Sequence, residues 1–192
     1  MKLIKKKEDW VKEGLKLLTE KGIHAVKVEV LARRLGVTKG SFYGYFLNRD
    51  ALLQEMLDHW EEILTGNVIK DVRNLEGDLC TKLSKILDIV DGHLDEDTDK
   101  SMTSWSFRDE RAKIVVNRVV RNRIDFMKSL FIEHGFSDEE SELRARLMHS
   151  FVHGDRCFPD TCEAHNSVLR KTMLKAFVAL VCAPPQKLMS EM

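Results

Sequence analysis

Val37-Thr38-Lys39-Gly40-Ser41-Phe42-Tyr43-Gly44-Tyr45-Phe46 reads VTKGSFYGYF, an unusual composition for a helix that only packs in a core. Aromatic rings stand here beside two glycines, two small hydroxyl side chains and a lysine. Glycine and serine keep a short helix slim, while threonine and lysine supply hydrogen-bond donors. The stretch therefore predicts a surface that binds a polyanion at close range.

The sequence around this stretch predicts two short helices joined by a glycine turn. The first spans residues 28–35 and ends at Gly36, where glycine favours a left-handed cap. Thr38 offers a hydroxyl N-cap for the second, which we expect to run through Tyr45. Two short helices connected in this way are typical of a helix-turn-helix.

Longer helices are predicted on both sides of this pair. Residues 5–21 form the first, with Gly22 as its C-cap. Asn48 is the N-cap of another that reaches about residue 64 to 66. The apolar spacing predicts that the inward faces consist of Trp10, Leu15, Leu17 and Leu18, and of Val28, Leu31, Ala32 and Leu35.

Between residues 10 and 57 the chain resembles the DNA-binding domain of the TetR family of transcriptional regulators. The resemblance rests on a long ordered set in which glycines and aromatics keep their register. These residues are Gly14-Leu15-Lys16-Leu17-Leu18 with Gly22, Val28-Glu29-Val30-Leu31-Ala32-Arg33-Arg34-Leu35-Gly36-Val37, Thr38-Lys39-Gly40-Ser41-Phe42-Tyr43-Gly44-Tyr45-Phe46 and Asn48-Arg49-Asp50-Ala51-Leu52-Leu53.

The resemblance implies that this surface contacts DNA. Lysine and threonine suit both phosphates and base edges, so the sequence leaves their targets open. Phe42 and Phe46 are better explained as core residues, whereas a tyrosine hydroxyl seeks a polar partner. Lys27 and Tyr45 depart from the family's usual capping hydroxyl and histidine. The predicted DNA-binding residues are Lys27, Thr38, Lys39, Gly40, Ser41, Tyr43, Tyr45 and Arg49.

The charge of the chain is balanced overall but divided along its length. The 192 residues carry 31 basic and 31 acidic side chains, yet residues 1–50 hold 12 Lys/Arg against 6 Asp/Glu. Residues 51–99 hold 4 against 13. A basic front end is what a chain shows when that end meets a polyanion, although a solvated lysine run explains the charge equally well.

Composition also predicts the cellular setting. No apolar run of 18 or more residues occurs, so we expect no membrane span. The N-terminus lacks the apolar segment and cleavage site of a secretory signal, which predicts a cytoplasmic protein. Four cysteines are too few for a disulfide framework and suit a reducing compartment; they are Cys80, Cys157, Cys162 and Cys182.

Helical periodicity continues to the C-terminus, so we expect an all-α protein with two domains. The DNA-binding domain takes residues 1–50, and residues 67–192 form a larger regulatory and dimerisation domain. Its helices are expected over 79–94, 101–110, 112–134, 138–157 and 162–182. The resemblance implies that the last two pair in a homodimer. Their apolar stripe, which core packing shares, is Leu143, Leu147, Ser150, Phe151, Gly154, Leu169, Met173, Phe177 and Leu180.

The family resemblance also implies that the dimer binds a palindromic operator. It further implies a small-molecule effector that moves the two DNA-binding heads of the dimer out of register. No cofactor is expected, and the sequence does not identify the effector. Soft and aromatic side chains accept apolar guests, although such stripes more often form plain core. The candidate pocket residues are Met102, Trp105, Phe107, Phe126, Met127 and Met148.

A cluster of histidines and cysteines leaves an alternative open. His149, His153 and Cys157 recur every four residues, and Cys162 and His165 follow a Pro159 turn. Imidazole and thiolate are ligands of zinc and copper, and side chains four apart share a helix face. The pattern predicts a metal- or thiol-responsive regulator as the alternative, while surface histidines are commoner.

No enzyme motif is present in the sequence. It lacks a nucleophile elbow, a glycine-rich phosphate loop and an HExxH zinc motif. We therefore expect a regulator and not an enzyme. An adaptor without DNA affinity would leave Lys39 and Tyr43 without a role.

Overall fold

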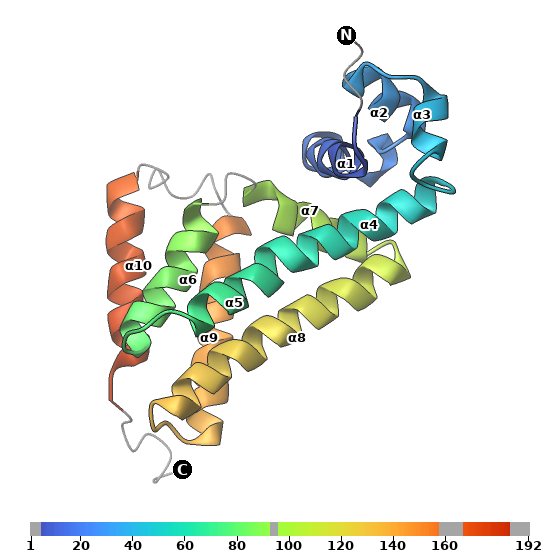
Figure 1. The fold of residues 1–192 in the computed structure, drawn as a ribbon. Helices are drawn as coiled ribbons and strands as arrows, with labels where there is room; N and C mark the ends of the chain where they lie inside the picture. The colour runs from blue at the N-terminus through green and yellow to red at the C-terminus, as the bar shows by residue number, and fades with distance from the viewer. Residues whose placement is uncertain (1–4, 93–95, 158–166, 185–192) are drawn as a thin grey trace. The chain divides into compact units, whose positions relative to one another are not determined.

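The computed structural model describes residues 5–92, 96–157 and 167–184, with side chains described outside 90–97 and 155–171. The described residues form helices and connecting turns and contain no strand (Figure 1), which confirms the predicted all-α class. In these ranges, no helix combines the length and the apolar character needed to cross a membrane.

The chain divides into two compact units, and each interrupts the other in sequence. Unit 1 comprises residues 1–66 and 95–118, and unit 2 comprises residues 67–94 and 119–192. Residues 95–118, which we expected in the C-terminal domain, therefore belong with the helix-turn-helix. The reason is packing: Met102 and Trp105 are buried, and the Trp60 indole donates to Asp99 Oδ1 at 2.7 Å.

Unit 1 is built around the helix-turn-helix and the long helices that support it. α1 packs against α2, α4 and α7, and α2 packs against α3. The elements are α1 (Lys7–Lys21), the 3₁₀ turn η1 (Ile23–Ala25), α2 (Val28–Leu35), α3 (Lys39–Tyr43), α4 (Arg49–Glu61), the π-helical η2 (Glu62–Gly66), α7 (Glu96–Ser106) and the first part of α8 (Glu110–Glu133).

Most of the predicted helix ends in unit 1 are confirmed. α2 ends at Gly36, whose φ of 68° and ψ of 31° lie in the left-handed region that favours glycine. Asn48 caps α4 by accepting a 2.9 Å hydrogen bond from the Ala51 N–H. α3 is shorter than predicted and ends at Tyr43, because the chain turns after it and the Tyr45 N–H donates to Phe42 O.

The inward face of α1 differs by one position from the prediction. Leu15 is only half-buried, whereas Val11, Gly14 and Leu17 are buried together with Trp10 and Leu18. On α2, Leu31 and Ala32 are buried, but Val28 and Leu35 are half-buried. A Cβ on Gly14 would lie 2.7 Å from Met56 Sδ, so this glycine allows α1 and α4 to approach closely.

Unit 2 is a helical cluster with its own apolar core. α6 packs against α10 and α5, and Figure 1 shows α6 and α10 side by side. The predicted Ser137 cap is confirmed, since its hydroxyl accepts from the Glu140 N–H at 3.2 Å. The elements are α5 (Asn67–Arg73), α6 (Leu79–Gly92), the remainder of α8, α9 (Asp138–Cys157) and α10 (Ser167–Cys182).

Candidate nucleic-acid interface

α3 is anchored by one aromatic side chain and presents its neighbour to solvent. Phe42 is fully buried and packs against Trp10 and Phe46, with ring centroids 5.3 and 5.1 Å apart. Tyr43, the next residue, is 62% exposed. Consecutive helical residues point about 100° apart, so the burial of one ring fixes the outward direction of the other. The core prediction for Phe42 and Phe46 is confirmed.

The start of α3 exposes a row of small polar residues. Thr38, Lys39, Gly40 and Ser41 are all exposed. Thr38 occupies the N-cap position but makes no capping hydrogen bond, contrary to the prediction. Its hydroxyl instead lies 3.2 Å from the Ser41 hydroxyl, which competes for it within the same turn. A Cβ on Gly40 would meet only Thr38 Oγ1, at 3.7 Å, so packing within the chain does not require glycine here.

Two lysines, one at the N-cap of α2 and one on α3, contribute positive charge to this surface. Lys39 Nζ lies 2.7 Å from Glu29 Oε1 in an ion pair whose side chains are both more than half exposed. Such a pair is weak in water and can exchange its partner at little cost. Lys27 is exposed at the N-cap of α2 and forms no side-chain cap. The loss of a capping side chain at this position, which the sequence predicts, is confirmed.

Two of the predicted DNA-binding side chains hold the fold of unit 1 together. The Tyr45 hydroxyl donates to Lys5 O at 2.7 Å. Arg49 is half-buried and donates from Nε to Val26 O at 2.6 Å and from Nη2 to Ile23 O at 2.9 Å. These hydrogen bonds tie the start of α4 to η1. A contact of either side chain with DNA stays a prediction.

Comparison with known proteins identifies this segment. Residues 11–56 match the family described as bacterial regulatory proteins, tetR family. Residues 11–56 belong to the tetR family. The HTH-type transcriptional regulator YerO of Bacillus subtilis (strain 168) is 31% identical over 80 residues, which cover 42% of this chain. The matched part spans 26% of the length of YerO.

Solved structures of transcriptional regulators share the fold of nearly the whole chain. A transcriptional regulator from Rhodococcus sp. Rha1 is 16% identical with a TM-score of 0.73, covering 92% of this chain and 96% of its own. The regulator FadR from Bacillus subtilis, solved in complex with stearoyl-CoA, is 14% identical with a TM-score of 0.66 and covers 94% and 100%. The chain therefore shares the fold of these solved regulators.

The six predicted pocket residues are divided between the two units. Met102 and Trp105 are buried in unit 1, whereas Phe126, Met127 and Met148 belong to the core of unit 2. Phe107 is 82% exposed, so its assignment to a pocket wall is wrong. It lies just beyond the C-terminal end of α7, where the chain turns toward α8. Soft and aromatic composition alone did not separate core, surface and cavity.

The histidine cluster is only partly within the described residues. The rings of His149 and His153 lie 4.2 Å apart between centroids, and Arg123 Nη1 is 3.4 Å from His153 Nε2. A guanidinium beside an imidazole disfavours a cation at that ring. Among described residues, no group of three His, Cys, Asp or Glu side chains could hold a metal ion. The Cys157 side chain, Cys162 and His165 lie outside them, so the alternative stays a prediction.

Several contacts at the interface were not predicted from the sequence. Glu29 neutralises Lys39, and the Lys5 carbonyl holds Tyr45, across sequence separations of ten and forty residues. Neither pairing has a periodic signature, because each depends on how helices pack. An acidic residue on the helix that precedes a lysine-containing one is the only signal that the sequence offers for the first.

Proposed function

We propose that this protein is a homodimeric transcriptional regulator, a repressor that a small molecule releases from a palindromic operator. One observation carries the proposal: α3 exposes Lys39, Ser41 and Tyr43 beside the buried Phe42, within the segment that belongs to the tetR family. One helix-turn-helix reads few base pairs. Two copies spaced about 34–36 Å apart read a palindrome, which is why a dimer is required.

Exposed leucines in unit 2 support the homodimer. Leu143, Leu147 and Leu180 are 49, 51 and 69% exposed on α9 and α10. Phe151 and Phe177 stack at 4.0 Å with planes 9° apart and join these two helices. Of the other predicted interface residues, Ser150 and Gly154 are exposed and Met173 is half-buried, while the Leu169 side chain lies outside the described residues. Large exposed apolar side chains of this kind mark protein interfaces.

The proposed effector is a small molecule. The structure of FadR in complex with stearoyl-CoA supports such an effector, because FadR has this fold and binds a small molecule. An effector releases DNA only if it binds the two states of the regulator with different affinities. The proposal needs no cofactor and no catalytic step, and it places the protein with the chromosome in the cytoplasm.

The proposal is tested by selecting bound duplexes from a random pool with the purified chain. We expect one enriched palindrome, whose affinity falls steeply with salt because phosphate contacts release counterions. Tyr43→Ala and Lys39→Ala each lose the enrichment, while Arg121→Ala, an exposed arginine in unit 2, keeps it. Enrichment that survives both α3 variants, or affinity that ignores salt, overturns this proposal.

A further inference from the structure

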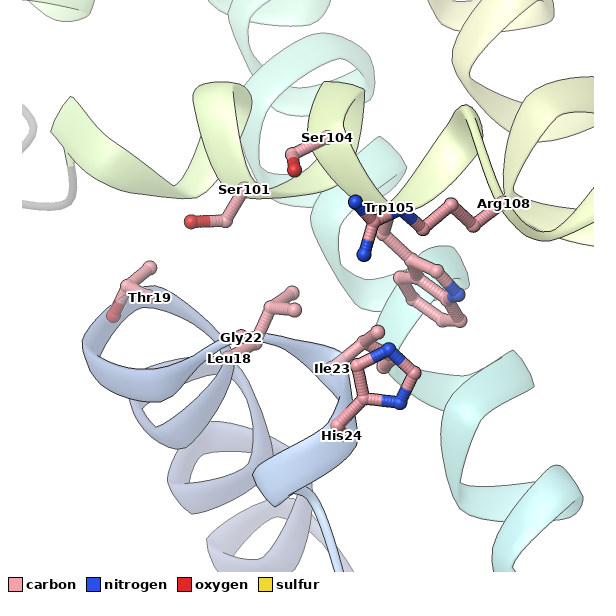
Figure 2. Close-up of a pocket in the computed structure, with 9 residues that line it drawn as sticks. All are labelled: Leu18, Thr19, Gly22, Ile23, His24, Ser101, Ser104, Trp105 and Arg108. Atoms are coloured by element: carbon pink, nitrogen blue, oxygen red, sulfur yellow. The ribbon is translucent and has the colours of Figure 1, made fainter.

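A groove with both polar and apolar lining lies between the end of α1 and α7 within unit 1 (Figure 2). We call it the α1–α7 groove, and its volume is about 200 Å³. Leu18, Ile23 and Trp105 supply apolar surface. The polar groups along it are Thr19, His24, Ser101, Ser104 and Arg108.

The groove holds the positive charge of one guanidinium, that of Arg108, without a compensating carboxylate. Arg108 and His24 line it, and no Asp or Glu does. In the described part of the chain, Arg108 forms no side-chain hydrogen bond or ion pair, and neither do the hydroxyls of Ser101 and Ser104. By contrast, Thr19 Oγ1 already donates to Lys16 O at 2.8 Å, so it offers no proton to a guest.

Within the part of the chain that the structure describes, most other arginines of unit 1 have a hydrogen-bond or ion-pair partner, which Arg108 lacks. Arg34 binds Glu20, Arg49 binds two backbone carbonyls, Arg111 binds Asp50 and Asp109, and Arg118 binds Glu61. Arg33, which also lacks such a partner among the described residues, lies exposed on α2 of the candidate DNA-binding head. Arg108 is also exposed and lacks such a partner in the described ranges, but its side chain lines the groove.

We propose that the α1–α7 groove binds a small oxyanion, a carboxylate or phosphate group, and that its occupation changes the affinity for DNA. A guanidinium donates two parallel N–H groups that match the geometry of an oxyanion, and the hydroxyls that line the same groove can donate further hydrogen bonds. The volume is below the roughly 300–1,000 Å³ of drug-sized ligand sites, so the guest is small.

The coupling to DNA follows from a second contact made by η1, which forms part of the groove wall. Ile23 and His24 belong to η1. The Ile23 carbonyl, with that of Val26, accepts the hydrogen bonds of Arg49, the first residue of α4. An anion that draws η1 and α7 together therefore acts on the element that positions the end of the helix-turn-helix. This second half of the inference rests on the proposed function.

The binding half is tested by isothermal titration calorimetry of the full chain, without DNA. The probes are sodium phosphate and sodium benzoate, each at an ionic strength held constant with sodium chloride. We expect saturable binding of one probe per chain, and the better probe identifies phosphate or carboxylate as the preferred group. Arg108→Gln weakens binding about tenfold or more, because it removes the charge-assisted hydrogen bonds.

Two variants keep this test decisive. Arg121→Gln, which removes an exposed arginine of unit 2, leaves binding unchanged. Ser104→Ala weakens it without changing any charge, which a nonspecific ionic effect would not show. No saturable heat with either probe, or equal binding by the Arg108→Gln chain, overturns the site.

The regulatory half uses the same probes on the protein bound to a fluorescent duplex. We expect the preferred anion to shift the affinity of the normal chain for DNA and to leave that of Arg108→Gln unchanged. Equal shifts in both chains overturn the coupling. If the chain binds no duplex at all, the proposed function fails, whereas the calorimetric result still decides the site.

Discussion

The α3 surface of unit 1 and the α9 surface of unit 2 both expose large side chains, but of different chemistry. α3 presents Tyr43 among hydroxyl and ammonium groups, whereas α9 presents Leu143 and Leu147. A tyrosine combines an apolar ring with a polar tip and suits a polar, charged partner. Exposed leucine side chains gain free energy only when they are removed from water, so they suit contact with another apolar surface. The contrast supports the proposed DNA-binding surface on α3 and the proposed homodimer surface on α9.

The largest expected effect comes from the two neighbouring rings of α3. Phe42→Ala removes a fully buried ring that contacts Trp10 and Phe46, and we expect a loss of about 3–5 kcal/mol in the free energy of unfolding. Tyr43→Ala changes that free energy by about 0.5 kcal/mol or less, because the side chain is exposed. Denaturant unfolding measures both. Similar losses in the two variants would contradict the division between core and surface.

A smaller effect is expected on the α9 surface. Leu147→Lys places a charge on the proposed interface, and symmetry introduces it twice per dimer. We expect the dimer dissociation constant, measured by analytical ultracentrifugation, to rise roughly 10- to 100-fold. Ile132→Lys is the matched control, since Ile132 is 45% exposed on α8 outside the predicted stripe. A dimer that tolerates Leu147→Lys but not Ile132→Lys would place the interface elsewhere.

Prediction from sequence succeeded differently in the two units. In unit 1, caps such as Gly36 and Asn48 are local signals, so the helix-turn-helix followed from the residues themselves. In unit 2, Leu147 and Met148 stand next to each other, and only packing shows that the first is exposed and the second buried. The placement of α7 in unit 1 was equally hidden, because it depends on pairs such as Trp60 and Asp99 across 39 residues.

The caps at Asp109 and Ser137 extend the comparison to pH. Partial burial tends to raise the pKa of Asp109, but hydrogen bonds from Arg111, the Ala112 N–H and Trp105 outweigh it and lower the pKa below its usual value. A lowered carboxyl pKa adds stability above the unfolded value near 3.9, and this stability disappears as pH falls through the folded pKa. The hydroxyl cap of Ser137 does not titrate in this range.

We therefore expect Asp109→Ala and Ser137→Ala to diverge in acid. Each costs about 1 kcal/mol of unfolding free energy at pH 7, because each removes an N-cap acceptor. Toward pH of about 3, the cost of Asp109→Ala shrinks while that of Ser137→Ala persists. Urea unfolding at both pH values measures this. Parallel behaviour of the two variants would show that the Asp109 charge adds nothing to its cap.

The smallest expected effect concerns the ion pair that restrains Lys39 on the α3 surface. The hydrogen bond from Lys39, followed by one from the backbone, lowers the pKa of Glu29, so this carboxylate is charged at neutral pH. Before Lys39 contacts a phosphate, it must leave Glu29 Oε1, 2.7 Å away. Glu29→Gln removes the competing charge, and since the pair is exposed we expect only about a two- to threefold gain in affinity for DNA. Fluorescence anisotropy with a labelled duplex measures the gain. The gain disappears at high salt, because salt ions then screen the attraction between Lys39 and Glu29.

Glu20→Gln is the control, because Glu20 pairs with Arg34 between α1 and α2 and leaves Lys39 untouched. Weaker binding by Glu29→Gln would mean that Glu29 orients Lys39 toward DNA, and the ion pair would then be part of the DNA-binding surface on α3.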